Sequence, residues 1–196
     1  MVSCNTIGRF LGLDPSQIRK DFEIVGIVGK PRVGHNVPSL VQSLESFLGC
    51  QLPKPTVLAG ADPLAQALLC LDGFKQFGLR PCGVFDTDEK RIGNEVQGLE
   101  VMPLGFLPDF VRMRKVQVGV ITLPGWQAQH AADFMIKGGV RAIWNFAPVV
   151  LRVPADVIVE NQNLCYSLAA LSAKLARVSQ PGLRPESRAV RGGIES

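Results

Sequence analysis

The sequence is poor in cysteine, histidine and tyrosine, and each shortage excludes a class of site. Its five cysteines are scattered over 196 residues and never spaced as C-x-x-C. An odd, unpatterned set argues against a disulfide framework and against a zinc site, and it suits a reducing cytoplasm. With two histidines and one tyrosine, the chain shows no acid/base pair of the kind an oxidoreductase places beside its cofactor. We therefore predict a cytoplasmic protein that is not an enzyme and binds no metal.

Long apolar runs and strong charge are lacking as well. No run approaches the roughly 18 apolar residues that a membrane span needs, and no basic start precedes an apolar signal core. The formal net charge is +4, which permits contact with nucleic acid without requiring it. A hydrophobic content of 46% with 19% charged residues predicts a folded protein with a real core.

The N-terminal region is predicted to hold two short helices. The first shows an apolar face over residues 2–11 and is stopped by Gly12. The second opens with Asp14 as N-cap and Pro15 at the first helical position. Two short helices joined by a three- or four-residue turn are typical of a helix-turn-helix. The basic, glycine-rich stretch "GIVGKPRVG" that follows has the composition of a small β-wing.

The rest of the chain predicts a linker helix followed by alternating strands and helices. An apolar stripe from Val37 to Leu48 predicts the linker, and Gly49 ends it. Alternation from Lys54 onward implies parallel strands with crossover helices, hence a doubly wound α/β sheet. The sites of such sheets lie beyond the C-terminal ends of the strands. Predicted strands lie in "PTVLAG", "PCGVFDTD", "VQVGVITLP" and "VRAIWNFAP".

The turn after the first of these strands departs from a known pattern. A Rossmann domain holds the pyrophosphate of a dinucleotide at a G-x-G-x-x-G turn, and here the glycine positions read Gly60, Asp62 and Ala65. A carboxylate about 4 Å from a phosphate charge costs about 4 kcal/mol at an effective dielectric near 20. Pro63 also removes a backbone N–H. Since aspartate and proline are ideal N-cap and first-turn residues, we predict a helix capped by Asp62 and a much reduced affinity for pyrophosphate.

Taken in order, the motifs resemble those of the Rex family of bacterial redox-sensing transcriptional repressors, over about residues 2–175. "SQIRKDF" is similar to a recognition-helix run ending in R-K-D-L, and "GKPRVG" to a G-x-R-G-V-G wing. "FDTD" resembles F-D-x-D, "NFAPVVLRVP" is nearly the family consensus, and "ENQNL" resembles E-N-V-D. The order and spacing of these segments carry the resemblance.

The resemblance implies a homodimer of winged helix-turn-helix and Rossmann domains. Such a dimer represses genes from a palindromic operator when NAD⁺ dominates and leaves the DNA when NADH binds. Together with the well-capped helix and the basic wing, it predicts contacts to double-stranded DNA from Ser16, Gln17, Arg19, Lys20, Lys30 and Arg32. Together with the strand-end positions, it predicts an NAD(H) site, weakened or lost, at Gly60, Ala61, Asp62, Pro63, Leu64, Ala65, Asp86, Thr122, Leu123, Pro124, Asn145, Phe146, Ala147 and Pro148.

Several positions depart from the family pattern. A winged helix-turn-helix needs a further first helix, whereas Met1 here comes directly before the second. Either the start has been truncated or misassigned, or the DNA-binding domain is degenerate. In this partial domain we expect apolar side chains to lose cover worth on the order of 1.5–3 kcal/mol each. These side chains are Phe10, Leu11, Ile18 and Phe22. In the wing the cation is displaced by one residue, and Asn163 replaces the aspartate of E-N-V-D, which puts redox sensing in question.

The predicted organisation has four parts: residues 1–50 for the winged helix-turn-helix and linker helix, 51–160 for the Rossmann-like domain, 161–178 for a C-terminal dimerisation helix, and 179–196 for a disordered tail. Leu164, Leu168, Leu171 and Leu175 share one face of that helix. The helix either packs across a dimer, as the resemblance implies, or covers its own sheet. Two other functions stay open: a family member that no longer senses NADH and acts as a constitutive regulator or dimerisation partner, and a CoA-binding-like α/β module.

Overall fold

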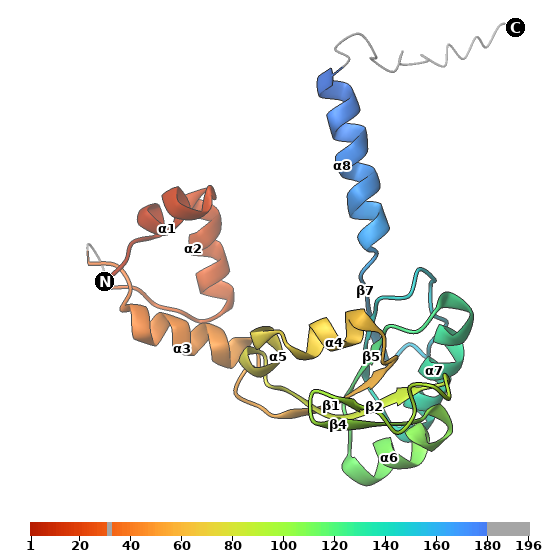
Figure 1. Ribbon diagram of the computed structural model, residues 1–196. Coiled ribbons are helices and arrows are strands. Elements are labelled where there is room, and N and C mark those ends of the chain that lie inside the picture. The colour runs from red at the N-terminus through yellow and green to blue at the C-terminus, as the bar shows by residue number, and fades with distance from the viewer. Residues whose placement is uncertain (31–32, 180–196) are drawn as a thin grey trace, which may run out of the picture.

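The computed structural model describes residues 1–30 and 33–179, in three successive parts (Figure 1). A small helical domain comes first, an α/β domain follows, and a single helix ends the described chain. Two predictions lie outside the described residues: the wing contact from Arg32 and the disorder of the tail beyond Ser179.

The N-terminal domain consists of three helices, each begun by a polar cap. These are α1 (Cys4–Leu11), α2 (Pro15–Ile24) and α3 (Val37–Phe47), whose N-caps are Ser3, Asp14 and Asn36. Gly12 ends α1 in the left-handed region at φ 67°, where a residue without Cβ is favoured. The two predicted helices and the linker helix are confirmed.

The loop between α2 and α3 is tied to the start of the chain. Lys30 N–H donates to Gly34 O at 2.9 Å, and the backbones of Val2 and His35 exchange two hydrogen bonds of 2.8 Å. The loop therefore folds back on itself as a short wing, which is anchored beside the first residue of α1.

The predicted loss of apolar cover in this domain is half right. Phe10 is 89% exposed and Leu11 is exposed too, but Ile18 and Phe22 are buried. Leu40 of α3 packs against Ile18 and Phe22 and covers them. Partly buried neighbours complete this apolar cluster. Those neighbours are Val2, Cys4, Ile7, Ile27 and Leu44.

The α/β domain is built on a seven-stranded sheet in the order β3-β4-β2-β1-β5-β6-β7. All pairs are parallel except β3 with β4. The strands are β1 (Lys54–Ala59), β2 (Leu79–Asp86), β3 (Glu95–Val96), β4 (Leu99–Pro103), β5 (Val118–Ile121), β6 (Ala142–Asn145) and β7 (Ile158–Asn161). The four predicted strands are β1, β2, β5 and β6. The three that were missed are the edge strands β3 and β7, and β4, which lies between β3 and β2.

Helices cover both faces of the sheet, as the doubly wound prediction requires (Figure 1). The short helices α4 (Pro63–Leu69) and α5 (Asp72–Gln76) pack on one face. On the other face lie α6 (Leu107–Arg114), preceded by a 3-10 turn over Leu104–Phe106, and α7 (Gly125–Gly138). The larger apolar cluster lies under α6 and α7. The α/β Rossmann-like fold predicted from the alternation is confirmed.

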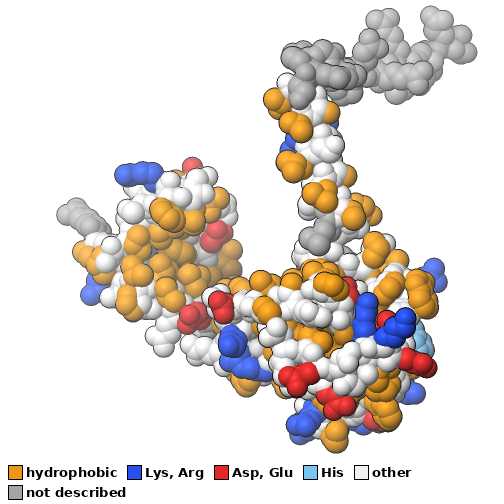
Figure 2. All heavy atoms as spheres, in the orientation of Figure 1, with side chains coloured by type: hydrophobic (Ala, Val, Ile, Leu, Met, Phe, Trp, Pro, Cys, Tyr) orange, Lys and Arg blue, Asp and Glu red, His pale blue; other side chains and the backbone are white. Residues whose placement is uncertain are grey.

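The helix α8 (Leu164–Ser179) projects away from the sheet and does not cover it (Figure 1). Apolar side chains of α8 are exposed to solvent, and Figure 2 shows them in orange along the length of the helix. Those exposed are Tyr166, Leu168, Leu171, Leu175 and Val178. The alternative in which this helix packs on its own sheet is therefore wrong. None of the helices in the described ranges is long and apolar enough to cross a membrane.

Candidate functional site

A hollow of about 240 Å³ lies at the C-terminal ends of the central strands, where the sequence predicts a site. It is formed by the turn after β1 and by the loops that follow β5 and β6. Its lining residues are Gly60, Asp62, Arg91, Thr122, Leu123, Pro124, Phe146, Ala147 and Pro148. Eight of the fourteen predicted cofactor residues are therefore brought together here.

Gly60 places the turn after β1 in contact with the loop after β5. Its φ is +119°, and a Cβ at this position would lie 2.1 Å from Thr122 Oγ1. Only glycine fits such a close approach of two backbones. The Thr122 hydroxyl is buried and has no hydrogen-bond partner among the described residues. Gly60 leaves space for a ligand that lies across the strand ends, and the Thr122 hydroxyl is able to hydrogen-bond to it.

Asp62 caps the helix that follows, as the sequence predicts. Its carboxylate accepts a hydrogen bond from Ala65 N–H at 2.9 Å, with Pro63 at the first helical position. The Asp62 carboxylate therefore occupies the helix N-terminus, where the partial positive charge of a helix attracts anions. Because the same side chain lines the hollow, an anionic ligand would meet a carboxylate instead of free backbone N–H groups.

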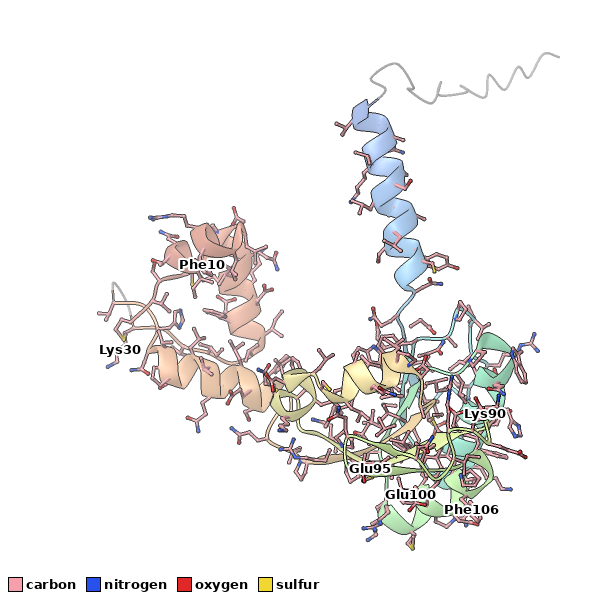
Figure 3. All side chains as sticks on the ribbon, in the orientation of Figure 1. Phe10, Lys30, Lys90, Glu95, Glu100 and Phe106 are labelled. Carbon is pink, nitrogen blue, oxygen red and sulfur yellow. The ribbon has the colours of Figure 1, made fainter. Side chains whose placement is uncertain are left out.

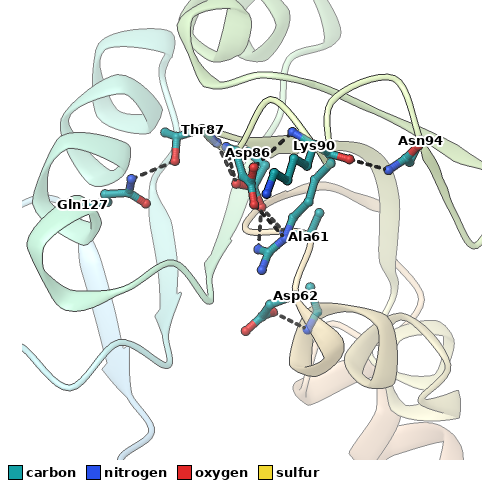
Figure 4. A network of polar contacts seen from close by, with 10 residues as sticks. Ala61, Asp62, Asp86, Thr87, Lys90, Asn94 and Gln127 are labelled. Atoms are coloured by element: carbon teal, nitrogen blue, oxygen red, sulfur yellow. Dashed lines mark hydrogen bonds and ion pairs between the residues drawn. The ribbon is translucent and has the colours of Figure 1, made fainter.

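Asp86, at the end of β2, is buried, with 1% of its surface exposed. One of its carboxylate oxygens accepts from the N–H groups of Thr87 at 2.7 Å and Asp88 at 2.9 Å. The other accepts from Ala61 N–H at 2.7 Å and from Arg91 at 3.1 Å (Figure 4). Burial alone would raise the pKa of Asp86, but these hydrogen bonds outweigh it and hold the pKa below its usual range. The carboxylate thus fixes the β1 turn to the β2 loop.

Arg91 is the lining residue that sequence reasoning missed. It forms ion pairs with Asp86 at 3.1 Å and with Asp88 at 3.6 Å, and it brings a positive charge into the hollow beside Asp62. The signal was available in part, since Arg91 follows the "FDTD" motif by three positions. Nothing in one sequence says that the loop turns this side chain back over the strand ends.

Two side chains fasten the neighbouring loops. Gln127, in the first turn of α7, donates to Thr87 Oγ1 at 2.7 Å and joins the β2 loop to α7 (Figure 4). Asn145 is fully buried; its amide donates to Val149 O and to Asn161 Oδ1, each at 2.9 Å. Asn145 thus shapes the "FAPVV" loop and uses its polar atoms within the chain.

Six predicted cofactor residues lie beside the hollow rather than in its lining. Ala65 is buried in the cluster under α4, which Leu64 joins as a partly buried neighbour. Pro63 is exposed on the first turn of α4. The remaining three are Ala61, Asp86 and Asn145, which hold the surrounding turns in place.

The predicted DNA-contacting residues lie on the N-terminal domain. Ser16, Gln17, Arg19 and Lys20 lie in α2 with exposed side chains. Ser16 hydrogen-bonds to the Asp14 carboxylate, and Gln17 donates to Asp21 at 2.7 Å. Lys30 is exposed in the wing, at the outer edge of the domain (Figure 3).

A dinucleotide fits one part of this site better than another. Gly60, the free Thr122 hydroxyl and the two loops after β5 and β6 fit a ligand that crosses the strand ends. At the start of α4, Asp62 already caps the helix and Pro63 has no N–H to donate. The strand ends and loops of a Rossmann-like site are present, and the Asp62 carboxylate lies at its helix N-terminus.

Comparison with known proteins agrees with this fold. The model of the CoA binding domain matches residues 53–149. A redox-sensing transcriptional repressor Rex from Pelotomaculum thermopropionicum is 41% identical over 92% of this chain and 85% of its own length. The Rex of Treponema denticola is 38% identical over 89% of this chain and 83% of its own.

Solved structures of the same family superpose over nearly the whole chain. RSP in complex with NAD⁺ and operator DNA matches with a TM-score of 0.86 and 34% identity, covering 91% of this chain and 82% of that one. RSP in complex with NADH matches with a TM-score of 0.79 and 33% identity, covering 91% and 83%. RSP is described as a Rex-family repressor. With the helix-turn-helix, the Rossmann-like sheet and these relatives together, the chain belongs to the Rex family of redox-sensing transcriptional repressors.

Proposed function

We propose that this chain is a homodimeric transcriptional repressor that binds a palindromic operator and responds to the NADH/NAD⁺ balance with a weakened dinucleotide site. It acts in the cytoplasm as a regulator and carries out no reaction of its own. The observation that carries the proposal is the match, over 91% of the chain, to a repressor solved in complex with NAD⁺ and operator DNA. The units are residues 1–50 for DNA, 51–160 for the dinucleotide and 161–178 for the partner.

DNA contact is supported by where the cations lie. Arg19 and Lys20 are exposed on a well-capped helix, and Lys30 is exposed in the adjoining wing. Helix side chains of this kind reach base edges and phosphates in a major groove. A wing cation reaches the backbone or a narrow minor groove.

Dimerisation through α8 is supported by its unpartnered leucines. Leu168, Leu171 and Leu175 are all more than 60% exposed, on a helix that projects away from the sheet (Figure 1). Burying each one contributes on the order of 1.5–3 kcal/mol, and an isolated helix of this length is marginal in water without packing. A second copy supplies both the cover and the twofold symmetry that a palindromic operator requires.

Weakened dinucleotide binding is supported by the start of α4. The Asp62 carboxylate lies on the helix N-terminus and lines the hollow, so a pyrophosphate adds like charge to a site that is already neutralised. Arg91 offsets part of this repulsion, but it is already paired with Asp86 and Asp88.

The same observation favours a second candidate, a Rex paralogue that no longer senses NADH. Such a protein would bind the operator at every NADH/NAD⁺ ratio, or would serve as a dimerisation partner for another family member. A CoA-binding-like module is disfavoured, because the match to that domain leaves the helix-turn-helix domain outside it.

The test is a gel shift of the full chain on a palindromic Rex operator, with NAD⁺, with NADH and with neither, together with calorimetry for NADH. We expect a shift with NAD⁺ and with neither, and release only at NADH concentrations well above micromolar. A sub-micromolar Kd for NADH contradicts the weakened site, and a shift that NADH never releases establishes the non-sensing paralogue. Absence of any shift contradicts the repressor itself.

A further inference from the structure

A thiol and an imidazole face each other inside the N-terminal domain. Cys4 Sγ lies 3.7 Å from His35 Nε2, and both residues are half-buried. They line a hollow of about 650 Å³ between α1, α2 and the wing. The thiol therefore lies beside an imidazole and can be reached from solvent. Both residues lie in the N-terminal domain, apart from the hollow at the strand ends.

The imidazole is held firmly in place. Its backbone is fixed by the two hydrogen bonds to Val2, and its ring packs edge-on against Phe22 with centroids 4.9 Å apart. Gly29 lies so close that a Cβ there would come within 2.7 Å of His35 Cε1. The Nδ1 atom is buried and has no hydrogen-bond partner in the part of the chain that the structure describes. Nε2 is thus the ring nitrogen that has a side-chain partner within the described residues, and that partner is the Cys4 thiol.

The surroundings of Cys4 carry features that are typical of reactive cysteines. Cys4 is the first residue of α1, where the positive end of the helix stabilises an anion, and cysteines at helix N-termini beside histidine are the reactive ones. Arg19 and Lys30 line the same hollow, against a single acid, Glu23. The charge around the thiol is therefore positive on balance.

We propose that Cys4 is a peroxide-reactive thiol whose oxidation lowers the affinity of the N-terminal domain for operator DNA. The thiolate sulfur attacks one oxygen of a hydroperoxide, the O–O bond breaks, and an S–O bond forms to give the sulfenic acid. Sulfur loses two electrons and the peroxide gains them. The leaving hydroxide or alkoxide takes up the proton that His35 accepted from the thiol.

The consequence for DNA follows from what the pair holds together. An oxygen added to the Cys4 sulfur changes the group that faces His35 Nε2, and the His35 ring is already packed against Phe22 and beside Gly29. His35 carries the backbone bridge that ties the wing to the start of the chain. In the proposal, a changed contact at His35 acts on the wing through this bridge, and this is the route by which oxidation of Cys4 lowers DNA affinity. This second half of the proposal rests on the proposed DNA-binding function, whereas the reactivity of the thiol does not.

Reactivity is tested on the full-length protein by brief treatment with limiting iodoacetamide, followed by mass spectrometry of each cysteine. Exposure alone predicts that Cys70 and Cys165, which are exposed, react before the half-buried Cys4. We expect the reverse, with Cys4 labelled about tenfold or more faster than Cys70. In His35→Phe, which keeps a ring on Phe22 but removes the imidazole, the rate at Cys4 should fall towards that of Cys70. Labelling of Cys4 at or below the Cys70 rate in the wild-type protein overturns the proposal.

The effect on DNA is tested by the operator gel shift before and after hydrogen peroxide, in wild-type protein and in Cys4→Ser. We expect peroxide to weaken wild-type binding about tenfold or more, reversibly with dithiothreitol, and to leave Cys4→Ser unchanged. Equal binding by a wild-type protein shown to be oxidised at Cys4 overturns the coupling. If untreated protein does not bind the operator, the proposed repressor function has failed instead, and the labelling result still decides whether Cys4 is reactive.

Discussion

Two helices of this chain open with the same Asp-Pro pair, yet the pair acts differently in the two places. In α2, Asp14 accepts from Ser16 N–H at 2.7 Å and faces solvent. In α4, Asp62 accepts from Ala65 N–H at 2.9 Å and lines the hollow at the strand ends. Both pairs satisfy a helix N-terminus in the way their residue types predict.

The difference lies in what each helix end faces. The start of α2 faces water, and Asp14 caps a helix that carries exposed cations. The Asp14 carboxylate lines no part of the hollow at the strand ends. The start of α4 faces the edge of a parallel sheet, which is where an anion would use the helix N-terminus. The same local stabilisation therefore faces solvent in α2 and faces the strand-end hollow in α4.

The largest effect is expected at the turn that precedes the α4 cap. Gly60→Ala should lower the free energy of unfolding by about 3 kcal/mol, because φ is +119° and the new Cβ collides with Thr122. Gly12→Ala, at the end of α1, is the matched control: φ is also positive there, but no atom lies within 4 Å of the added Cβ. Urea unfolding of both variants measures the difference, and equal losses would show that the β1 turn is no tighter than an ordinary helix end.

The next effect concerns the Asp86 carboxylate, which accepts a hydrogen bond from Ala61 N–H in the turn before α4. Asp86→Asn should lower the free energy of unfolding by about 2 kcal/mol, because an amide cannot accept all four hydrogen bonds and Arg91 loses a charged partner. The pKa of Asp86 is lowered in the folded protein. Its contribution to the free energy of unfolding is therefore fully present above the unfolded-state pKa of roughly 3.9. It is lost as the pH falls through the lower folded-state pKa.

The difference in stability between wild type and Asp86→Asn should therefore be constant from about pH 5 to pH 7 and narrow below about pH 4. Urea unfolding across this range measures it. A difference that already narrows near pH 6 would contradict the lowered pKa of Asp86.

A smaller effect is expected on NADH affinity, and it should distinguish the Asp62 cap from the Asp14 cap. Asp62→Gly should raise the affinity for NADH about tenfold, roughly 1.4 kcal/mol, because it removes the carboxylate and restores the glycine of the usual turn. Asp14→Gly makes the same chemical change at α2 and should leave NADH affinity unaltered. Calorimetry on both variants decides the matter, and an unchanged Kd in Asp62→Gly would show that Asp62 does not obstruct the pyrophosphate.

The smallest effect is the loss of the cap itself. Asp62→Ala should cost about 1 kcal/mol of stability and Asp62→Asn much less, since asparagine caps as well as aspartate. Asp14→Ala should shift the unfolding midpoint in the same direction. The hydroxyl and N–H of Ser16 hold the pKa of Asp14 below its ordinary value, so that loss should shrink in acid. Thermal unfolding at pH 7 and pH 3 compares them, and a pH-independent loss at Asp14 would contradict its role as an ionised cap.

Much of the fold could be predicted because its signals are local. The Asp-Pro caps, Gly12 and the buried central strands each carry their structure in a few adjacent residues. Edge strands β3 and β7 could not be predicted: β3 is two residues long, and Ile158 in β7 is exposed. Both strands exist because a neighbouring strand offers hydrogen bonds, which no periodicity in their own residues records.

The candidate site divides in the same way. Gly60, Asp62 and Thr122 were predicted from motif and strand-end position, and the structure brings them together. Arg91 was missed because its place depends on the path of the β2 loop. Asn145 was predicted in the site, yet its amide is used to fold the loop beside it. Strand-end position predicts closeness to a site but not the direction of a side chain.

By itself, the sequence determined the capped helices, the parallel α/β core and the family, because hydrophobic alternation, cap residues and motif order are all written in neighbouring positions. Only the tertiary structure decided that α8 projects away from the sheet with Leu168, Leu171 and Leu175 exposed. It alone also placed Arg91 against Asp86 and Cys4 beside His35. These pairings join residues from different parts of the chain, and their distances are set by how the elements pack and by the paths of the loops between them.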